Sequence, residues 1–275
     1  MTIKHKLQGD AMQMAICQLG ADQSIYCEAG KFLWKTANVS METRLGKGAP
    51  GSEPAAAASP AGGGGGSRLL KKALSTATEM GKRALAGESL AFQWFRAAGE
   101  SGLVAFAGVL PGQIKALELD GSGAWMAEKD AFVCAESTVD FDIAFQGFKA
   151  GRKGGEGFVL ERFSGTGTVL IAGAGNFIEL NPAKYGGKLQ VDTGCVVAFQ
   201  ESIKYGVERV GALNAQTAVT ALFGGEGLSL ATLEGEGQVI LQSMTYDGII
   251  NALSKRMGGN DRRGLTGGLL GGGND

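Results

Sequence analysis

Gly155-Glu156-Gly157-Phe158 opens a phrase that occurs three times in this chain, with related versions beginning at Gly87 and Gly225. After each Gly-Glu pair come alternating apolar residues, then two glycines, then an apolar segment. Self-similarity at intervals of this length is the signature of one supersecondary unit that is built several times. The phrase therefore predicts three copies of one structural unit.

A second pattern stands upstream of each phrase. An apolar residue is followed seven positions later by a β-branched one, in the pairs Phe32 and Val39, Phe132 and Val139, and Val196 and Ile203. Apolar and polar residues mostly alternate around these pairs, which is the period of a strand with one face on a core. Three such units predict an all-β fold that is closed, or nearly closed, about an internal pseudo-threefold axis, because closure protects strand edges.

The domain organisation follows from the spacing of the two patterns. We predict a single β domain over residues 1–243, with repeats at about 12–107, 108–173 and 174–243. Residues 47–86 of the first repeat have no counterpart in the other two and are predicted to be an insertion. Its first part is rich in proline, alanine and glycine, a composition that favours a flexible linker. Ser67 is a candidate N-cap for a short helix over residues 68–80.

Residues 244–275 differ in character from the β units. Their apolar residues have helical spacing over residues 245–257, and two glycines then end the pattern. We predict a C-terminal helix followed by a glycine-rich tail. The apolar positions of this helix are Tyr246, Ile249, Ile250, Leu253 and Met257.

Composition excludes several classes of protein. The chain has 275 residues with 47 glycines and 5 prolines, which suits an all-β protein with many tight turns. The formal net charge of -1 provides no global basic field for a nucleic acid, so we expect no nucleic-acid partner. Trp34, Trp94 and Trp125 lie in strand patterns, where they could stack on single-stranded bases or pack in a core. The near-neutral charge favours core packing.

The cysteines and the N-terminal residues indicate the cellular compartment of the protein. Cys17, Cys27, Cys134 and Cys195 are far apart in the sequence and form no Cys-x-x-Cys pair, which favours reduced, partly buried thiols. Residues 1–10 lack the apolar run of a secretory signal and do not resemble a transit peptide. No stretch is long and apolar enough for a spanning helix. These features predict a cytoplasmic protein, at most peripheral to a membrane.

The sequence gives little support for a catalytic site or a metal site. His5 is the only histidine, so a histidine-rich metal site or a Ser-His device on the β scaffold is not expected. The basic segment at residues 151–155 lacks the spacing of a phosphate-binding loop. We therefore expect no enzyme activity, no cofactor and no metal.

The recurring glutamates of the Gly-Glu phrases are the first candidate site. Glu88, Glu156 and Glu226 occupy equivalent positions in the three units. A ring of carboxylates about an axis could bind cations or cationic partners. The alternative is that each carboxylate accepts backbone hydrogen bonds within its glycine turn and fixes the strand register, and this structural interpretation is favoured.

The helix predicted in the insertion is the second candidate. It is basic and amphipathic, and could lie on an anionic membrane surface, contact a partner protein, or dock on its own β domain. The C-terminal helix, which carries Lys255 and Arg256, has the same alternatives and could also form an oligomer contact. The basic residues at issue in the insertion are Arg68, Lys71, Lys72, Lys82 and Arg83.

Four stretches of this sequence resemble a known family, the altered-inheritance-of-mitochondria protein 24 family. They are Ala29-Gly30 with residues 39–43, Pro111-Gly112-Gln113-Ile114 with residues 117–119, Val191-Asp192-Thr193-Gly194 with residues 197–199, and the segment from Leu222 to Leu228. The resemblance extends over about residues 12–242. It implies a double-stranded β-helix, of the type called tryptophan RNA-binding attenuation protein-like, with pseudo-threefold internal symmetry.

The same resemblance bears on function. Fungal members are proteins of the mitochondrial inner membrane that support respiratory-chain and cristae organisation, and the family has no established catalytic residues to transfer. This chain differs in lacking a transit peptide and in having the insertion and the tail. A fold name that mentions RNA does not imply RNA binding.

Two functional hypotheses remain. The first is a non-enzymatic scaffold or interaction protein, homo-oligomeric, that binds other proteins or an anionic membrane surface. The second is a module that binds a small molecule or a nucleic acid through its β surface or an axial cavity.

Overall fold

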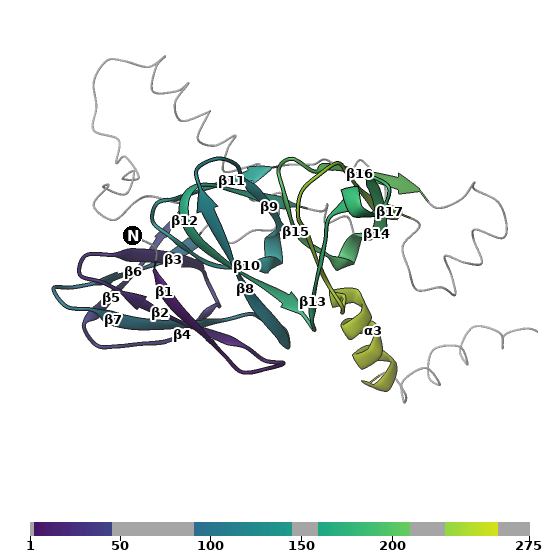
Figure 1. Ribbon diagram of the computed structural model, residues 1–275. Coiled ribbons are helices and arrows are strands. Elements are labelled where there is room, and N and C mark those ends of the chain that lie inside the picture. Colours follow the sequence, from purple (N-terminus) through teal and green to yellow (C-terminus); the bar gives the residue numbers. More distant parts are fainter. Residues whose placement is uncertain (1–2, 46–90, 145–158, 210–228, 258–275) are drawn as a thin grey trace, which may run out of the picture.

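The chain forms antiparallel β-sheets followed by one C-terminal helix, as a computed structural model describes for residues 3–45, 91–144, 159–209 and 229–257 (Figure 1). The predicted all-β class is therefore confirmed. Helix α3 spans Tyr246–Met257, in agreement with the helix expected over residues 245–257. The predicted helix over residues 68–80 and the Gly-Glu openings of all three phrases, residues 87–90, 155–158 and 225–228, lie outside the described residues.

The strands fall into three groups along the chain, which lie side by side in Figure 1 from purple through teal to green. The first group contains β1 (Lys4–Gln8), β2 (Met14–Leu19), β3 (Ser24–Glu28), β4 (Phe32–Lys35), β5 (Val39–Leu45), β6 (Ala91–Ala97) and β7 (Gly102–Ala107). The second contains β8 (Gly112–Asp120), β9 (Trp125–Glu128), the 3-10 turn η1 (Lys129–Ala131), β10 (Phe132–Glu136), β11 (Val139–Ala144) and β12 (Leu160–Ala174).

The third group contains β13 (Phe177–Leu180), η2 (Pro182–Tyr185), β14 (Lys188–Asp192), η3 (Thr193–Cys195), β15 (Val196–Gln200), β16 (Lys204–Arg209), β17 (Ser229–Glu234) and β18 (Val239–Gln242). The described strands form three sheets. A four-stranded sheet has the order β1-β2-β7-β4, and a three-stranded sheet has the order β14-β17-β16. An eleven-stranded sheet runs β13-β18-β15-β9-β12-β10-β3-β6-β5, with β8 and β11 also paired to β12.

Three strands near the ends of the groups make equivalent pairings. Strand β7 pairs with β2 and β4, the second half of β12 pairs with β8 and β10, and β18 pairs with β13 and β15. The second pairing of each carries a register shift at the same place, at Phe32/Trp34, Phe132/Cys134 and Val196/Ala198. The first residue of each pair, Phe32, Phe132 or Val196, is the apolar residue that opens the upstream sequence pattern. The pattern therefore marks a bulge as well as a strand.

Strand β12 shows what the glycines of the phrase do. Its first half pairs with β9 and β11, and its second half pairs with β8 and β10. Gly165 and Gly167, at the junction, have φ of 92° and 129°. Residues with a Cβ rarely adopt these angles, so the glycines allow one strand to serve two sets of partners.

The core consists of three clusters of buried side chains. Val39, Val139 and Ile203 are all buried, and each belongs to a different cluster. The middle cluster is the most aromatic, and Tyr26, Trp94 and Phe132 pack together in it. Each cluster receives side chains from strands far apart in the sequence, so neighbouring sheets are held together mainly by apolar burial.

Two glutamines tie each group to the next. Gln13 Oε1 accepts a hydrogen bond from the backbone N–H of Ile114 (2.8 Å), and Gln113 Oε1 accepts one from Phe177 (3.0 Å). Both backbone groups lie on strands that begin the following group. Because Gln113 belongs to the Pro111-Gly112-Gln113-Ile114 motif, that motif has a structural role at a boundary between groups.

The prediction that the three tryptophans pack in the core is confirmed only in part. Trp94 and Trp125 are buried, whereas Trp34, on β4, is 39% exposed. His5, the single histidine, lies half-buried on β1. In both cases the position of the strand in its sheet decides the exposure.

Candidate functional site

All the site residues that the sequence predicts fall in segments that the structure does not describe. This applies to Glu88, Glu156 and Glu226, and equally to Arg68, Lys71, Lys72, Lys82 and Arg83. Their roles stay predictions. The surfaces considered below are built from other residues.

A broad polar depression, here called the polar hollow, lies at the end of the molecule formed by the third strand group. Its volume is about 620 Å³. Its walls come from β13, from η2, from the last residue of β15 and from the turn before β18. The residues that line it are Glu179, Leu180, Asn181, Lys184, Tyr185, Gln200, Glu236, Gly237 and Gln238.

The local sequence Asn181-Pro182 explains one wall of the hollow. The Asn181 side chain caps η2 by accepting a hydrogen bond from the backbone N–H of Ala183 (3.0 Å), and Pro182 occupies the first turn. Gly186 then ends the turn in the left-handed conformation, with φ of 78°. Both ends of this short turn are therefore fixed, and Tyr185 is held at the rim with 57% of its surface exposed.

A second part of the lining is held by side-chain bonds to Glu179. Lys115 forms an ion pair with one of its carboxylate oxygens (2.7 Å), and the amide of Gln238 donates to the other. Gln200 also accepts a hydrogen bond from the backbone N–H of Gln238 (2.7 Å) through its side-chain oxygen. The polar lining is therefore ordered by its own contacts.

A second surface is apolar and lies at one end of the sheets. Five of the ten large apolar side chains that are exposed in the described residues belong to the turns at this end or to the segment that leads into and forms α3: Met12, Val109, Met244, Ile250 and Leu253. We call this set the apolar end. Met12 and Val109 lie in turns, Met244 precedes α3, and the last two lie on α3.

Backbone contacts bring these turns together. The N–H of Gln13 donates to Gly112 (3.0 Å), that of Gly175 donates to Pro111 (3.0 Å), and that of Met244 donates to Ala174 (3.3 Å). The turns between β1 and β2, β7 and β8, and β12 and β13 therefore form one row that leads to α3. Figure 1 shows α3 extending away from the sheets beyond this row.

Over residues 246–254 of α3, whose burial the structure describes, only the first turn is anchored. Tyr246 and Ile249 are half-buried, whereas residues 250–254 are all exposed. Burial and the nearby carboxylates of Asp130 and Glu128 raise the pKa of Tyr246. Glu128 precedes η1 and Asp130 belongs to it, so the start of the helix lies near η1.

Glu128, near the start of α3, has an unusual pKa. Burial, reinforced by the negative charge of Asp130, raises the pKa of Glu128 to about 7. Its carboxylate also accepts a hydrogen bond from the backbone N–H of Asp130 (2.8 Å), whose carbonyl in turn accepts one from the buried Lys31 ammonium (3.0 Å). Glu128 therefore titrates near neutral pH at the base of α3.

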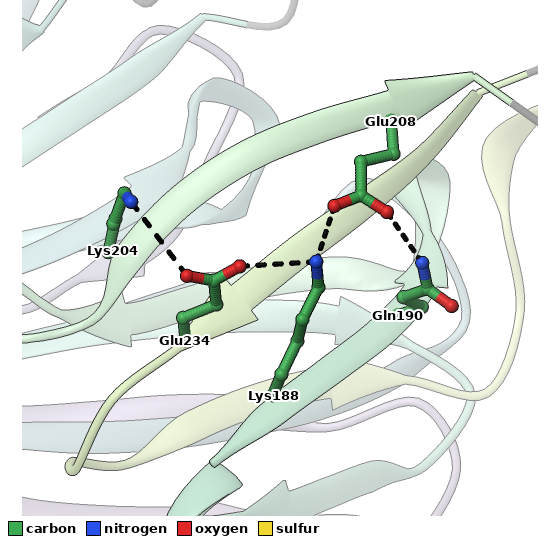
Figure 2. Close-up of polar contacts among 5 residues, drawn as sticks. All are labelled: Lys188, Gln190, Lys204, Glu208 and Glu234. Atoms are coloured by element: carbon green, nitrogen blue, oxygen red, sulfur yellow. Dashed lines mark hydrogen bonds and ion pairs between the residues drawn. The ribbon is translucent and has the colours of Figure 1, made fainter.

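Charged side chains also form a network across the three-stranded sheet, shown in Figure 2. Lys188 contacts both Glu208 and Glu234 (3.2 Å to the latter), and Lys204 lies 3.8 Å from Glu234. Gln190 donates to Glu208 (2.7 Å). The contacts with Glu234 join neighbouring strands, whereas the contacts of Lys188 and Gln190 with Glu208 connect β14 to β16 across the central strand β17. These side chains are solvent-exposed, so they help to fix the strand register and add little stability.

The buried thiols do not form a reactive site. Cys27 and Cys134 are directly opposed on β3 and β10, and Cys17 lies in the same core cluster. Burial raises the pKa of Cys27 to about 12 and also raises that of Cys134. Thiols that stay protonated are poor nucleophiles, so their role is packing. Sequence spacing gave no sign that these cysteines meet.

The described segments contain neither a cluster of metal-ligand side chains nor a membrane-spanning helix. No three His, Cys, Asp or Glu side chains of residues 3–45, 91–144, 159–209 and 229–257 are arranged to hold a metal ion. None of the helices in these ranges is long and apolar enough to cross a membrane.

The polar hollow and the apolar end were not predicted from the sequence. The Asn-Pro pair at 181–182 and the two glycines at 186–187 are a local signal for a rigid turn, which could have drawn attention to Tyr185. Nothing in the sequence indicates that Met12, Val109 and Met244 share one surface, because the pairing of distant strands alone brings them together.

Comparison with known proteins identifies relatives over nearly the whole chain. A Streptococcus pyogenes serotype M6 protein described as uncharacterized is 24% identical over 250 residues, covering 89% of this chain and 88% of that protein. The crystal structure of a Streptococcus pyogenes protein superposes with a TM-score of 0.67 at 22% identity, covering 92% of this chain and 99% of that one, which shows a shared fold. The family described as Mitochondrial biogenesis AIM24 matches residues 5–244. The resemblance seen in the four sequence stretches is therefore confirmed, and the chain belongs to the AIM24 family.

Proposed function

We propose that this protein is a non-enzymatic cytoplasmic scaffold that docks on an anionic membrane surface through its apolar end. The observation that carries the proposal is the grouping of Met12, Val109, Met244, Ile250 and Leu253 at one end of the sheets. Scattered apolar residues are normal on a protein surface, whereas a group on protruding turns and a helix indicates a surface that is covered in use.

The shape and chemistry of this end favour a lipid surface over a protein groove. The residues protrude from turns and from a helix that extends away from the body, as insertion into an interface requires. Complete burial of one such side chain contributes roughly 1.5–3 kcal/mol, so partial insertion of several supports reversible binding.

Charge also favours an anionic surface. The last turn of α3 contains Lys255 and Arg256, and Arg262 and Arg263 follow in the sequence. Basic residues beside an apolar helix face add attraction to anionic lipid, roughly 1 kcal/mol for each one near the surface.

Co-sedimentation with vesicles tests this proposal. The full chain is expected to pellet with phosphatidylserine-phosphatidylcholine vesicles, and the double variant Ile250→Ser, Leu253→Ser is expected to bind at least about tenfold more weakly. The matched control is Leu33→Ser, Met41→Ser, which removes two exposed apolar side chains from β4 and β5 and should bind like the parent.

Equal binding by both double variants would contradict the proposal, and so would the absence of binding by the parent. Light scattering on the same proteins separates self-association from membrane binding. A fall in molecular mass for the α3 variant, with no vesicle binding by the parent, would assign the apolar end to a homo-oligomer contact instead.

We also propose that the three strand groups are internal repeats of a double-stranded β-helix with pseudo-threefold symmetry. Three observations support this: the equivalent pairings of β7, β12 and β18, the register shifts at equivalent positions, and the placement of Val39, Val139 and Ile203 in separate core clusters.

A further inference from the structure

The polar hollow keeps hydrogen-bonding capacity that the protein itself does not use. Asn181 and Gln200 each use the side-chain oxygen within the structure, and their NH₂ groups have no partner among the described residues. Gln238 uses its NH₂ group on Glu179, which leaves its side-chain oxygen open. Donors and acceptors therefore face one depression together.

The charges in the hollow favour neither a simple anion nor a simple cation. Glu179 is already paired with Lys115 and Gln238, which leaves Glu236 as the carboxylate and Lys184 as the cation without an ion pair in the described part of the lining. An anion would meet Glu236, and a cation would meet Lys184. A neutral ligand whose groups both donate and accept can use the carboxylate, the ammonium and the amides together.

Tyr185 adds an apolar platform to these polar groups. Its ring is 57% exposed although it stands on a turn whose two ends are fixed by Asn181 and Gly186. By contrast, Tyr26 is fully buried and uses its hydroxyl to donate to the carbonyl of Val139 (3.2 Å). A rigid, exposed aromatic face beside amides and a carboxylate suits a ligand with one apolar C–H face and a rim of hydroxyls.

We propose that the polar hollow binds carbohydrate, as a short chain of neutral pyranose units. A pyranose ring would lie on Tyr185 and direct its hydroxyls to Glu236, Gln238 and the free amide groups. The volume of about 620 Å³ lies within the usual range of ligand sites, roughly 300–1,000 Å³. The proposal is independent of membrane docking, because the hollow shares no residue with the apolar end.

Calorimetric titration of the full chain tests the proposal, with chitotetraose, maltotetraose and cellotetraose as probes. At least one tetrasaccharide is expected to bind, and Tyr185→Ala is expected to weaken that binding at least about tenfold. Tyr185→Trp keeps an aromatic face and should retain binding, and Glu236→Gln should weaken it several-fold. Trp34→Ala removes an exposed aromatic ring on β4, away from the hollow, and should bind like the parent.

The salt dependence of binding and titrations with competing ligands complete the test. Binding of a neutral sugar should change little between low and high sodium chloride, because few ions are displaced. Failure of all three tetrasaccharides to bind would overturn the proposal. So would equal binding by Tyr185→Ala and the parent, or tight binding of inorganic phosphate or calcium at the same residues.

Discussion

Replacing Gly112 by alanine is expected to lower the free energy of unfolding by about 3 kcal/mol or more. A Cβ at this position would lie 1.8 Å from the carbonyl oxygen of Gly173 and 2.9 Å from the N–H nitrogen of Gly175. Both atoms belong to backbone that is paired across β8 and β12, so neither can move without breaking the ladder. Urea unfolding followed by circular dichroism measures the effect.

Gly123→Ala is the control for this prediction. A Cβ there meets no atom within 4 Å, and its φ is not in the left-handed region. The control should unfold at or above the parent midpoint, because alanine restricts the unfolded chain. Equal midpoints for Gly112→Ala and Gly123→Ala would show that β8 and β12 do not approach as described.

Replacing Glu128 by glutamine is expected to stabilise the protein at pH 8 by up to about 3 kcal/mol, because the folded-state pKa of Glu128 is raised from 4.5 to about 7. Between these two values the native protein binds more protons than the unfolded chain. The free energy of unfolding of the parent therefore falls as pH rises from 4.5 to 7, and this loss persists above pH 7. Glutamine avoids the loss and still offers an oxygen to the N–H of Asp130.

Thermal unfolding of the parent and Glu128→Gln at several pH values tests this. The two curves should coincide near pH 4 and separate as pH rises, with the variant more stable above pH 7. Glu100→Gln, in the exposed turn between β6 and β7, is the control and should follow the parent at every pH. A constant difference between Glu128→Gln and the parent from pH 4 to 8 would contradict the raised pKa.

These two predictions concern residues that sequence reasoning treated very differently. Gly112 belongs to a motif that carried the family resemblance. A glycine is needed there because the backbone of Gly173 lies so close, and that contact depends on the pairing of β8 with β12. Glu128 attracted no attention in the sequence. Its pKa depends on burial and on Asp130, and burial is decided by the packing around η1.

The candidate functional surfaces could be predicted from the sequence even less well than these two residues. The glutamates and the basic residues that repetition and charge singled out lie outside the described residues, so their roles stay predictions. The polar hollow draws its lining from four separate segments of the third strand group. The apolar end draws on turns almost the whole length of the chain apart, from Met12 to Leu253.

The sequence by itself determined the all-β class, the C-terminal helix and the strand positions of Val39 and Val139. These properties depend on local periodicity and on residues that are neighbours in the chain. Only the tertiary structure decided that one long strand, β12, serves two sets of partners, that the thiols of Cys27 and Cys134 are inert, and which apolar side chains stay exposed. The physical reason is that burial, pKa and surface shape depend on contacts between distant segments, and strand pairing at long sequence separation sets those contacts.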